Sequence, residues 1–282
     1  MVKKRAPLKK ATPRPWYQQW YWWVLVIIAV VGIASWQLWP EAGLPVPDDN
    51  LPQAAIVDQL YAFGYKNPTL IDDLTRSLES AGFKVDLYQG TDVTTVSTYK
   101  KILASNYSVV IFRAHSGLIQ TEGEPVQTSI FTSEPFSVSS FSCSSDVANG
   151  ALVKARVKEG DPFYFAITSK FVREYMSGMN NAVVILSGCS GLYSTDLAQV
   201  FISKGASAYL GWDGSVGLEY VDRATSVFIG ALCQEGTSLD QAVNETLLEV
   251  GEDPEWHSEL KYFPTGASIG SNTLLELTKI GG

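Results

Sequence analysis

Acidic side chains are missing from the first forty residues, although those residues carry six basic ones. The rest of the 282-residue chain holds 15 basic residues and all 29 acidic residues, which gives it a formal charge of −14. Such an uneven charge excludes one uniform soluble globule, and the acidic part argues against nucleic acid as a partner. No internal repeat of fixed period is present either. Because 46% of the residues are apolar, the chain is also not disordered or fibrous.

Charge of either sign is missing between Trp20 and Trp39, and about 20 apolar residues are enough to cross a bilayer as a helix. Six of the eight tryptophans occur before residue 40, and they bracket the apolar run as interfacial aromatic residues do. We therefore predict a cytoplasmic basic leader over residues 1–19 and a transmembrane helix over residues 20–39. Because the positive charge precedes the helix, the rest is expected outside, as the extracytoplasmic domain of a single-pass cell-membrane protein.

A cleaved signal peptide is the alternative for this segment, because residues 32–34 resemble a signal-peptidase site. We favour the anchor, since the apolar run continues past that site. Residues 40–53 are rich in proline and in polar side chains, which predicts a short, stiff stalk between the anchor and the domain.

Residues 54–250 have the pattern of one α/β domain, because apolar strands alternate with amphipathic helices in its first part. The predicted strands cover residues 54–61, 84–88 and 108–113, and the predicted helices begin at Asn67 and Ser97. This order predicts a three-layer sandwich, in which helices cover both faces of a mostly parallel sheet.

Residues 117–162 interrupt this pattern with a stretch rich in Ser, Thr, Phe and Gly, for which we predict an inserted β-hairpin with loops. The pattern then resumes with a strand at 163–168 on the sheet edge, strands at 182–186 and 208–212, and helices at 195–204, 216–233 and 238–250. Residues 251–282 form a turn-rich C-terminal extension in which we assign no element.

Two strand ends carry side chains that are suited to nucleophilic catalysis. The strand at 108–113 leads into His115, and the strand at 182–186 leads into Cys189, each with glycine close by. In a parallel sheet the carboxyl ends of the strands share one edge, where an imidazole can take the proton of a thiol. Histidine is scarce, and His257, the only other one, lies in a polar segment typical of an exposed side chain.

This arrangement, an apolar strand ending in His and a second one ending in Cys-Ser-Gly, resembles the caspase–hemoglobinase fold. Caspases, legumain, gingipains, clostripain, separase and CHAT-domain proteases share that fold. Segments after the cysteine resemble CHAT and gingipain-type domains: Asp196-Leu197-Ala198, Lys204-Gly205-Ala206, Gly211-Trp212, Gly236-Thr237-Ser238-Leu239 and Gln241-Ala242-Val243.

The resemblance implies a cysteine endopeptidase that acts on a protein or peptide substrate without a metal or other cofactor. It implies Cys189 as the nucleophile and His115 as the group that protonates the leaving amine. The amide of Cys189, with that of Ser116 or Gly117, would form the oxyanion hole. Two departures from the family pattern, Ser116 directly after the histidine and Ser187 two residues before the cysteine, leave a catalytically inactive peptide-binding module as the alternative.

Two aspartates at strand ends are candidates for a substrate pocket. Asp58 lies in the first strand and Asp213 follows the strand at 208–212, with Trp212 as a candidate pocket wall. A carboxylate in the pocket favours cleavage after Arg or Lys. Aspartates at strand ends also cap turns, and the acidic domain can attract basic substrates through its field alone, so this specificity stays a hypothesis. We expect Arg113 to be a structural ion-pair partner.

Cysteine is scarce, and three cysteines leave one unpaired in an oxidising compartment. A disulfide between Cys143 and Cys233 would leave Cys189 as the thiol. The alternative is that all three are reduced, and the sequence does not decide between these two states.

Overall fold

The computed structural model describes residues 51–120, 123, 125–137 and 143–279. The predicted leader at 1–19, the predicted transmembrane helix at 20–39 and most of the predicted stalk lie outside these residues. Within the described part of the chain, no helix is long and apolar enough to cross a membrane.

A six-stranded sheet forms the centre of the domain, with the strand order β10-β9-β8-β3-β1-β2. Five strands pair in parallel, and only β10 is antiparallel to its neighbour, so the prediction of an α/β fold with a mostly parallel sheet is confirmed. The strands are β1 (Gln53–Asp58), β2 (Lys84–Gln89), β3 (Tyr107–Arg113), β8 (Val183–Ser187), β9 (Ala208–Trp212) and β10 (Leu260–Phe263).

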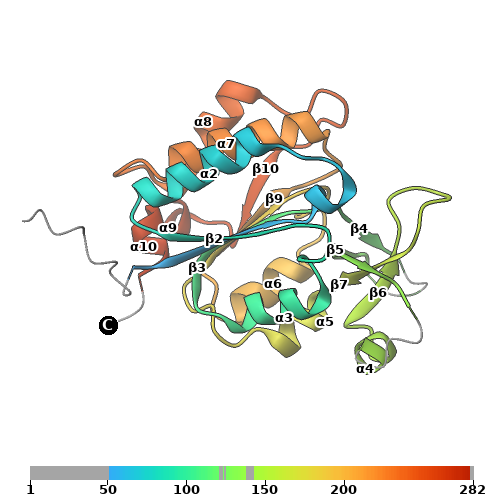
Figure 1. Ribbon diagram of the computed structural model, residues 1–282. Helices are drawn as coiled ribbons and strands as arrows, with labels where there is room; N and C mark the ends of the chain where they lie inside the picture. The colour runs from blue at the N-terminus through green and yellow to red at the C-terminus, as the bar shows by residue number, and fades with distance from the viewer. Residues whose placement is uncertain (1–50, 121–122, 124, 138–142, 280–282) are drawn as a thin grey trace, which may run out of the picture. The chain divides into compact units, whose positions relative to one another are not determined.

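Helices cover both faces of this sheet (Figure 1). Alternate residues of a strand point to opposite faces, and in β3 Val109 and Ile111 pack with one cluster while Val110 and Phe112 pack with the other. The first cluster includes α2 (Pro68–Ser80), α7 (Leu218–Leu232) and α8 (Leu239–Val250). The second cluster includes α3 (Val96–Ala104), α5 (Ser169–Tyr175) and α6 (Asp196–Ser203).

Local sequence signals place these helices close to their predicted positions. Asn67 caps α2 by accepting a hydrogen bond from the amide of Leu70, and Pro68 occupies the first turn, where its missing N–H costs nothing. Ser238 and Gln241 form a capping box that begins α8.

A second sheet, β4-β5-β7-β6, stands beside the main sheet (Figure 1). Its strands are antiparallel neighbours: β4 (Ser116–Ile119), β5 (Gln127–Pro135), β6 (Leu152–Ala155) and β7 (Tyr164–Ile167), with α4 (Ser144–Ala148) before β6. The predicted hairpin at 117–162 was therefore incomplete. The strand expected at the edge of the main sheet is β7, which pairs with β5 and β6 and lies inside the second sheet.

The chain differs from the sequence-based prediction at two further points. The first strand ends at Asp58, because residues Leu60–Phe63 turn into a 3-10 helix, η2. The C-terminal segment is part of the fold: it adds β10 to the main sheet, and it buries Leu274 and Leu277 of α10 (Leu274–Leu277) in the core beyond α9 (Ala267–Gly270).

Strand β2 is one edge of the main sheet, and its residues are the least buried of the six strands. Leu87 there is 45% exposed, with charged neighbours Lys84 and Asp86 in the same strand. Charged side chains on an edge strand hinder pairing with a second sheet edge.

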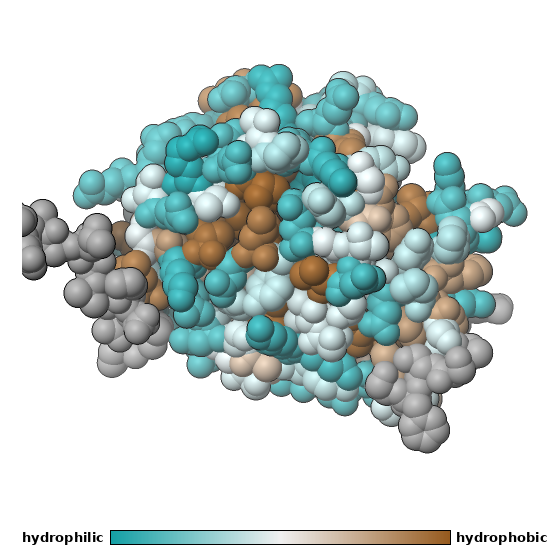
Figure 2. Space-filling view, in the orientation of Figure 1, coloured by the Kyte–Doolittle hydropathy of each residue, from teal (hydrophilic) through white to brown (hydrophobic). Residues whose placement is uncertain are grey.

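The face seen in Figure 2 is mainly polar, with separate apolar patches.

The main sheet separates two of the cysteines. Cys143 packs in the core cluster on the α3, α5 and α6 face, whereas Cys233 packs against the cluster on the α2, α7 and α8 face. A disulfide needs Cα atoms within about 7 Å, and strands of the sheet lie between these two layers. The predicted disulfide between Cys143 and Cys233 is therefore absent from this fold.

We predict that Cys143 and Cys233 are not linked even after expression in an oxidising compartment. Peptide mapping of the unreduced, alkylated protein by mass spectrometry should recover each of the two cysteines in a separate alkylated peptide. A peptide pair that carries a Cys143–Cys233 bond would contradict the placement of the two residues on opposite faces of the sheet.

Candidate active site

The carboxyl ends of β1 and β3 mark the point where the strand order of the main sheet reverses. From β1 the chain moves outward to β2 and then returns to β3 on the other side of β1. In open α/β sheets such a point forms a crevice, and ligands bind there. His115 follows β3 directly at this crevice, and Cys189 follows the adjacent strand β8.

The loops that carry His115 and Cys189 are in direct contact. Arg113 and Ser187 are register partners of β3 and β8, so His115 and Cys189 each lie two residues beyond the same rung. The Ser116 hydroxyl donates to the Cys189 carbonyl oxygen at 2.5 Å. Gly188 has to be glycine, because a Cβ there would overlap with the carbonyl oxygen of Ala114. The fold thus brings the loops that carry the two predicted catalytic residues into contact, through Ser116 and Gly188.

The turn after β8 holds Cys189 in a constrained backbone. Ser190 has a left-handed φ of 54°, which is uncommon outside glycine and typical of functional turns. Its amide donates to the Gly214 carbonyl oxygen at 2.6 Å, and its own carbonyl oxygen accepts from the Thr128 hydroxyl at 3.1 Å. The thiol of Cys189 lies 3.8 Å from the carbonyl oxygen of Val216. Segment 214–216 and strand β5 therefore both position the loop that carries Cys189.

The environment keeps the thiol and the imidazole uncharged. Burial raises the pKa of Cys189, and the negative charge of Asp253 raises it further, against the lowering effect of the contact with Val216. Burial lowers the pKa of His115 to about 4; the charge of Arg113 also lowers it, and Asp161 opposes both. At neutral pH the resting pair is a thiol and a neutral imidazole.

His115 is held by its main chain and surrounded by rings. Its amide donates to Gln59 Oε1 at 2.9 Å, and the Gln59 side chain donates to the Thr132 carbonyl oxygen at 3.2 Å. The imidazole centroid lies 5.2 Å from the ring of Phe63 and 5.7 Å from that of Tyr65. Its Nε2 is buried without a hydrogen-bond partner among the described residues, so the hydrogen-bonding capacity of this nitrogen is unused in the resting structure.

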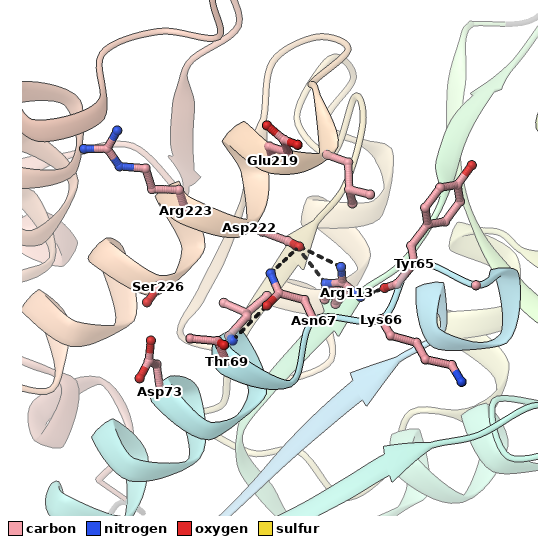
Figure 3. Close-up of a pocket in the computed structure, with 13 residues that line it drawn as sticks. Tyr65, Lys66, Asn67, Thr69, Asp73, Arg113, Glu219, Asp222, Arg223 and Ser226 are labelled. Atoms are coloured by element: carbon pink, nitrogen blue, oxygen red, sulfur yellow. Dashed lines mark hydrogen bonds and ion pairs between the residues drawn. The ribbon is translucent and has the colours of Figure 1, made fainter.

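A buried ion cluster lies directly beneath the histidine. Arg113, 1% exposed, contacts Asp58 at 2.7 Å and binds Asp222 through two nitrogens, each at 2.7 Å. It also donates to the Tyr65 carbonyl oxygen at 2.9 Å, and Asn67 donates to Asp222 at 2.9 Å (Figure 3). Burial lowers the pKa of Arg113, but the hydrogen bonds to Asp222 and the charge of Asp58 outweigh this effect and raise it. The expectation that Arg113 is a structural ion-pair partner is confirmed.

A cavity of about 510 Å³ opens above this cluster, between the N-terminal turns of α2 and α7 (Figure 3). Charged side chains of both signs line it, among them Lys66, Asp73, Glu219 and Arg223. Tyr65 stands at its border and also contacts His115, so the cavity adjoins the histidine.

The predicted pocket residues lie elsewhere than expected. Asp58 is 0% exposed and bound to Arg113 and to the Gln89 amide, so it has no free surface for a ligand. Trp212 is also 0% exposed and cannot serve as a pocket wall. Asp213 is partly exposed, but its carboxylate accepts from the Glu259 amide at 2.9 Å and lies 3.8 Å from Lys261. His257 is exposed, as predicted.

Three residues that support the site escaped the sequence reasoning. Asp222 lies on the buried face of α7, and a carboxylate among apolar helix positions was the one available signal. Gln59 carried no signal. Asp253 is 0% exposed and accepts from the Gly217 amide at 2.7 Å, which joins the segment around Val216 to the C-terminal part of the chain.

No protein-family model matches the chain, and no curated protein is significantly similar to it in sequence. Within the described residues, no group of three His, Cys, Asp or Glu side chains is placed to hold a metal ion.

We predict that Arg113→Met lowers the free energy of unfolding by about 3–5 kcal/mol, because it leaves two buried carboxylates without their cation. Urea denaturation at neutral pH measures the change. Arg223→Met is the matched control: this arginine is 65% exposed and 3.9 Å from Glu249, so its loss should cost at most about 1 kcal/mol. Equal effects of the two substitutions would contradict the role of the buried cluster.

We predict that the His115 ring titrates with a pKa of about 4 in the folded protein. Proton NMR can follow it, since a spectrum of His115→Gln identifies its signal among those of two histidines. The unfolded chain has the ordinary value of about 6.5, so it binds more protons than the folded chain between these two pH values. Stability should therefore fall as the pH drops through this window, and His115→Gln should flatten that dependence. A pKa of His115 at or above 6.5 would contradict the buried, uncharged ring.

Proposed function

We propose that this protein is a cysteine endopeptidase of the caspase-like class, with Cys189 as nucleophile and His115 as acid and base. The observation that carries this proposal is the contact between the loop after β3 and the loop after β8. His115, whose Nε2 is buried and unpartnered, follows β3 at the strand-order reversal, and Cys189 follows the adjacent strand β8, which supports the pairing of the two. The mostly parallel sheet with helices on both faces is compatible with the caspase–hemoglobinase fold that the sequence resembles.

In the proposed reaction Cys189 gives its proton to His115 as its sulfur attacks the carbonyl carbon of a peptide bond. His115 then passes that proton to the departing amine while the carbon–nitrogen bond breaks, which leaves an acyl-enzyme. Water, deprotonated by His115, releases the acid and restores the thiol. The pair is uncharged at rest, so no ion pair has to be separated before the substrate binds.

The oxyanion is proposed to be stabilised by main-chain amides. Ser116 and Gly117 begin β4, an edge strand of the second sheet. Successive amides of a strand point to opposite sides, so one of these two points away from β5. That amide and the amide of Cys189 are the proposed donors to the oxyanion.

We further propose that residues 20–39 anchor this peptidase in the cell membrane and that the domain lies outside. This proposal rests on the basic leader, the uncharged apolar run and the acidic domain. The substrates would then be proteins or peptides that reach the outer face of the membrane.

A peptide-binding module without catalysis is the second candidate. The specific observation in its favour is that burial raises the pKa of Cys189 and lowers that of His115, so that a reactive thiolate is scarce in the resting protein. Such a module would bind a peptide at the same crevice and leave it intact.

We predict that purified protein cleaves at least one of a set of reporter peptides with Arg, Lys, Asn or Asp before the scissile bond. Cys189→Ala should abolish cleavage, and His115→Ala should lower kcat/KM roughly 10²- to 10⁴-fold because proton transfer is lost. Cys233→Ser, which changes a thiol at the C-terminal end of α7 and not at a strand end, serves as the control and should keep its activity.

Cleavage that is equal in wild type, Cys189→Ala and His115→Ala would contradict the peptidase. Peptides bound tightly but left intact by wild type would identify the binding module instead. Alkylation by iodoacetamide over a pH series adds an independent readout, since the raised pKa of Cys189 should shift its labelling to alkaline pH.

A further inference from the structure

A second cavity, of about 360 Å³, is lined by His115 itself. Its other walls come from Phe63 and Tyr65 in and after η2, from Val157 and Pro162 in the β6–β7 loop, and from Tyr164 at the start of β7. The rings of Phe63 and Tyr164 lie 4.7 Å apart. The cavity thus combines aromatic and apolar walls with polar side chains, and it reaches the proposed catalytic histidine.

One carboxylate, that of Asp161, lies in the lining of this cavity. Asp161 belongs to the loop between β6 and β7, where its amide donates to the Lys158 carbonyl oxygen at 3.2 Å in a turn that includes Gly160 at a φ of 90°. Its side chain is partly buried, and among the described residues it accepts no hydrogen bond and has no ion pair within 4.0 Å. The other acids near the site, Asp58 and Asp222, are both bound by Arg113.

An unpaired carboxylate beside aromatic rings is a favourable binding site for a cation. Partial burial removes some of the water around the carboxylate without supplying a partner, and a cation that binds there compensates for the lost hydration. The faces of aromatic rings attract cations as well. Lys158 lines the same cavity, but it is exposed and not within ion-pair distance of Asp161, so it leaves the carboxylate open.

We propose that this cavity is a binding pocket for a lysine or arginine side chain of the substrate, with Asp161 as its specificity-determining residue. The proposal builds on the peptidase function and names its substrate class. The aliphatic part of the side chain packs between Phe63, Tyr65 and Tyr164, and its charged end pairs with Asp161. Because Tyr65 and His115 border the cavity, the bound side chain places the adjacent peptide bond at the histidine. The carboxylate comes from the β6–β7 loop and not from the strand ends where the sequence suggested Asp58 and Asp213.

The test uses the full-length protein and two small probes that differ in charge, argininamide and citrullinamide. Calorimetry should show that wild type binds argininamide more tightly than citrullinamide. Asp161→Asn, which keeps the shape, should weaken argininamide binding roughly ten- to hundredfold and leave citrullinamide binding unchanged. Glu159→Gln removes a charge from an exposed position of the same loop and should change neither.

Peptide reporters provide the second readout. The ratio of kcat/KM for an arginine reporter to that for a citrulline reporter should fall in Asp161→Asn by a similar factor. A ratio is used because a change in the pKa of His115 affects both reporters equally.

The outcomes separate this proposal from the proposed function. Equal binding of the two probes to wild type, unchanged argininamide binding in Asp161→Asn, or a loss that follows Asp213→Asn and not Asp161→Asn would overturn the pocket. Argininamide binding that depends on Asp161, in a protein whose peptide cleavage does not depend on Cys189, would support the pocket and overturn the peptidase.

Discussion

The buried guanidinium of Arg113 is the interaction on which the geometry of the site depends. One side chain joins Asp58 at the end of β1, Asp222 on α7 and the carbonyl oxygen of Tyr65 beyond η2. Each carboxylate is bound a second time, Asp58 by Gln89 and Asp222 by Asn67. Because His115 is only two residues beyond Arg113, this cluster sets the position of the histidine, of the Tyr65 ring beside it and of both adjoining cavities.

Burial of Cys189 and His115 determines their protonation states and therefore their reactivity. It keeps the thiol of Cys189 protonated and His115 neutral, which slows reaction with solvent oxidants and alkylating agents. In the peptidase that we propose, a substrate that covers the crevice brings its carbonyl group to the thiol and excludes water while the proton is transferred. The aromatic residues around His115 then act twice, since they lower its pKa through desolvation and form the wall of the neighbouring cavity.

The sequence predicts the main sheet and the two strand ends well, because buried parallel strands such as β3 and β8 are short, continuous apolar runs. The second sheet was predicted only as a hairpin. Strands β4 and β6 are each four residues long, too short to show a clear alternating pattern, and they form by pairing with β5 and β7. The pocket residues could not be assigned in this way. In the sequence, an aspartate at the end of a strand looks the same whether a ligand or an arginine binds it. The partner that decides the role of Asp58, Arg113, is 55 residues away in the chain.

The C-terminal segment also supports the candidate site, although the site was predicted from the ends of strands β3 and β8 alone. Strand β10 pairs with β9, and the loop before it is bound to segment 213–217 through Asp253 and through the Ser258 hydroxyl, which donates to the Ser215 carbonyl oxygen at 2.6 Å. That segment in turn accepts the amide of Ser190 and contacts the thiol of Cys189. The loop that carries Cys189 is therefore bound by the second sheet, through Thr128, and by segment 214–216, which the last part of the chain holds in place. Neither support lies within the β-α-β pattern from which the site was predicted, and both bind the main chain of Ser190, whose φ is left-handed.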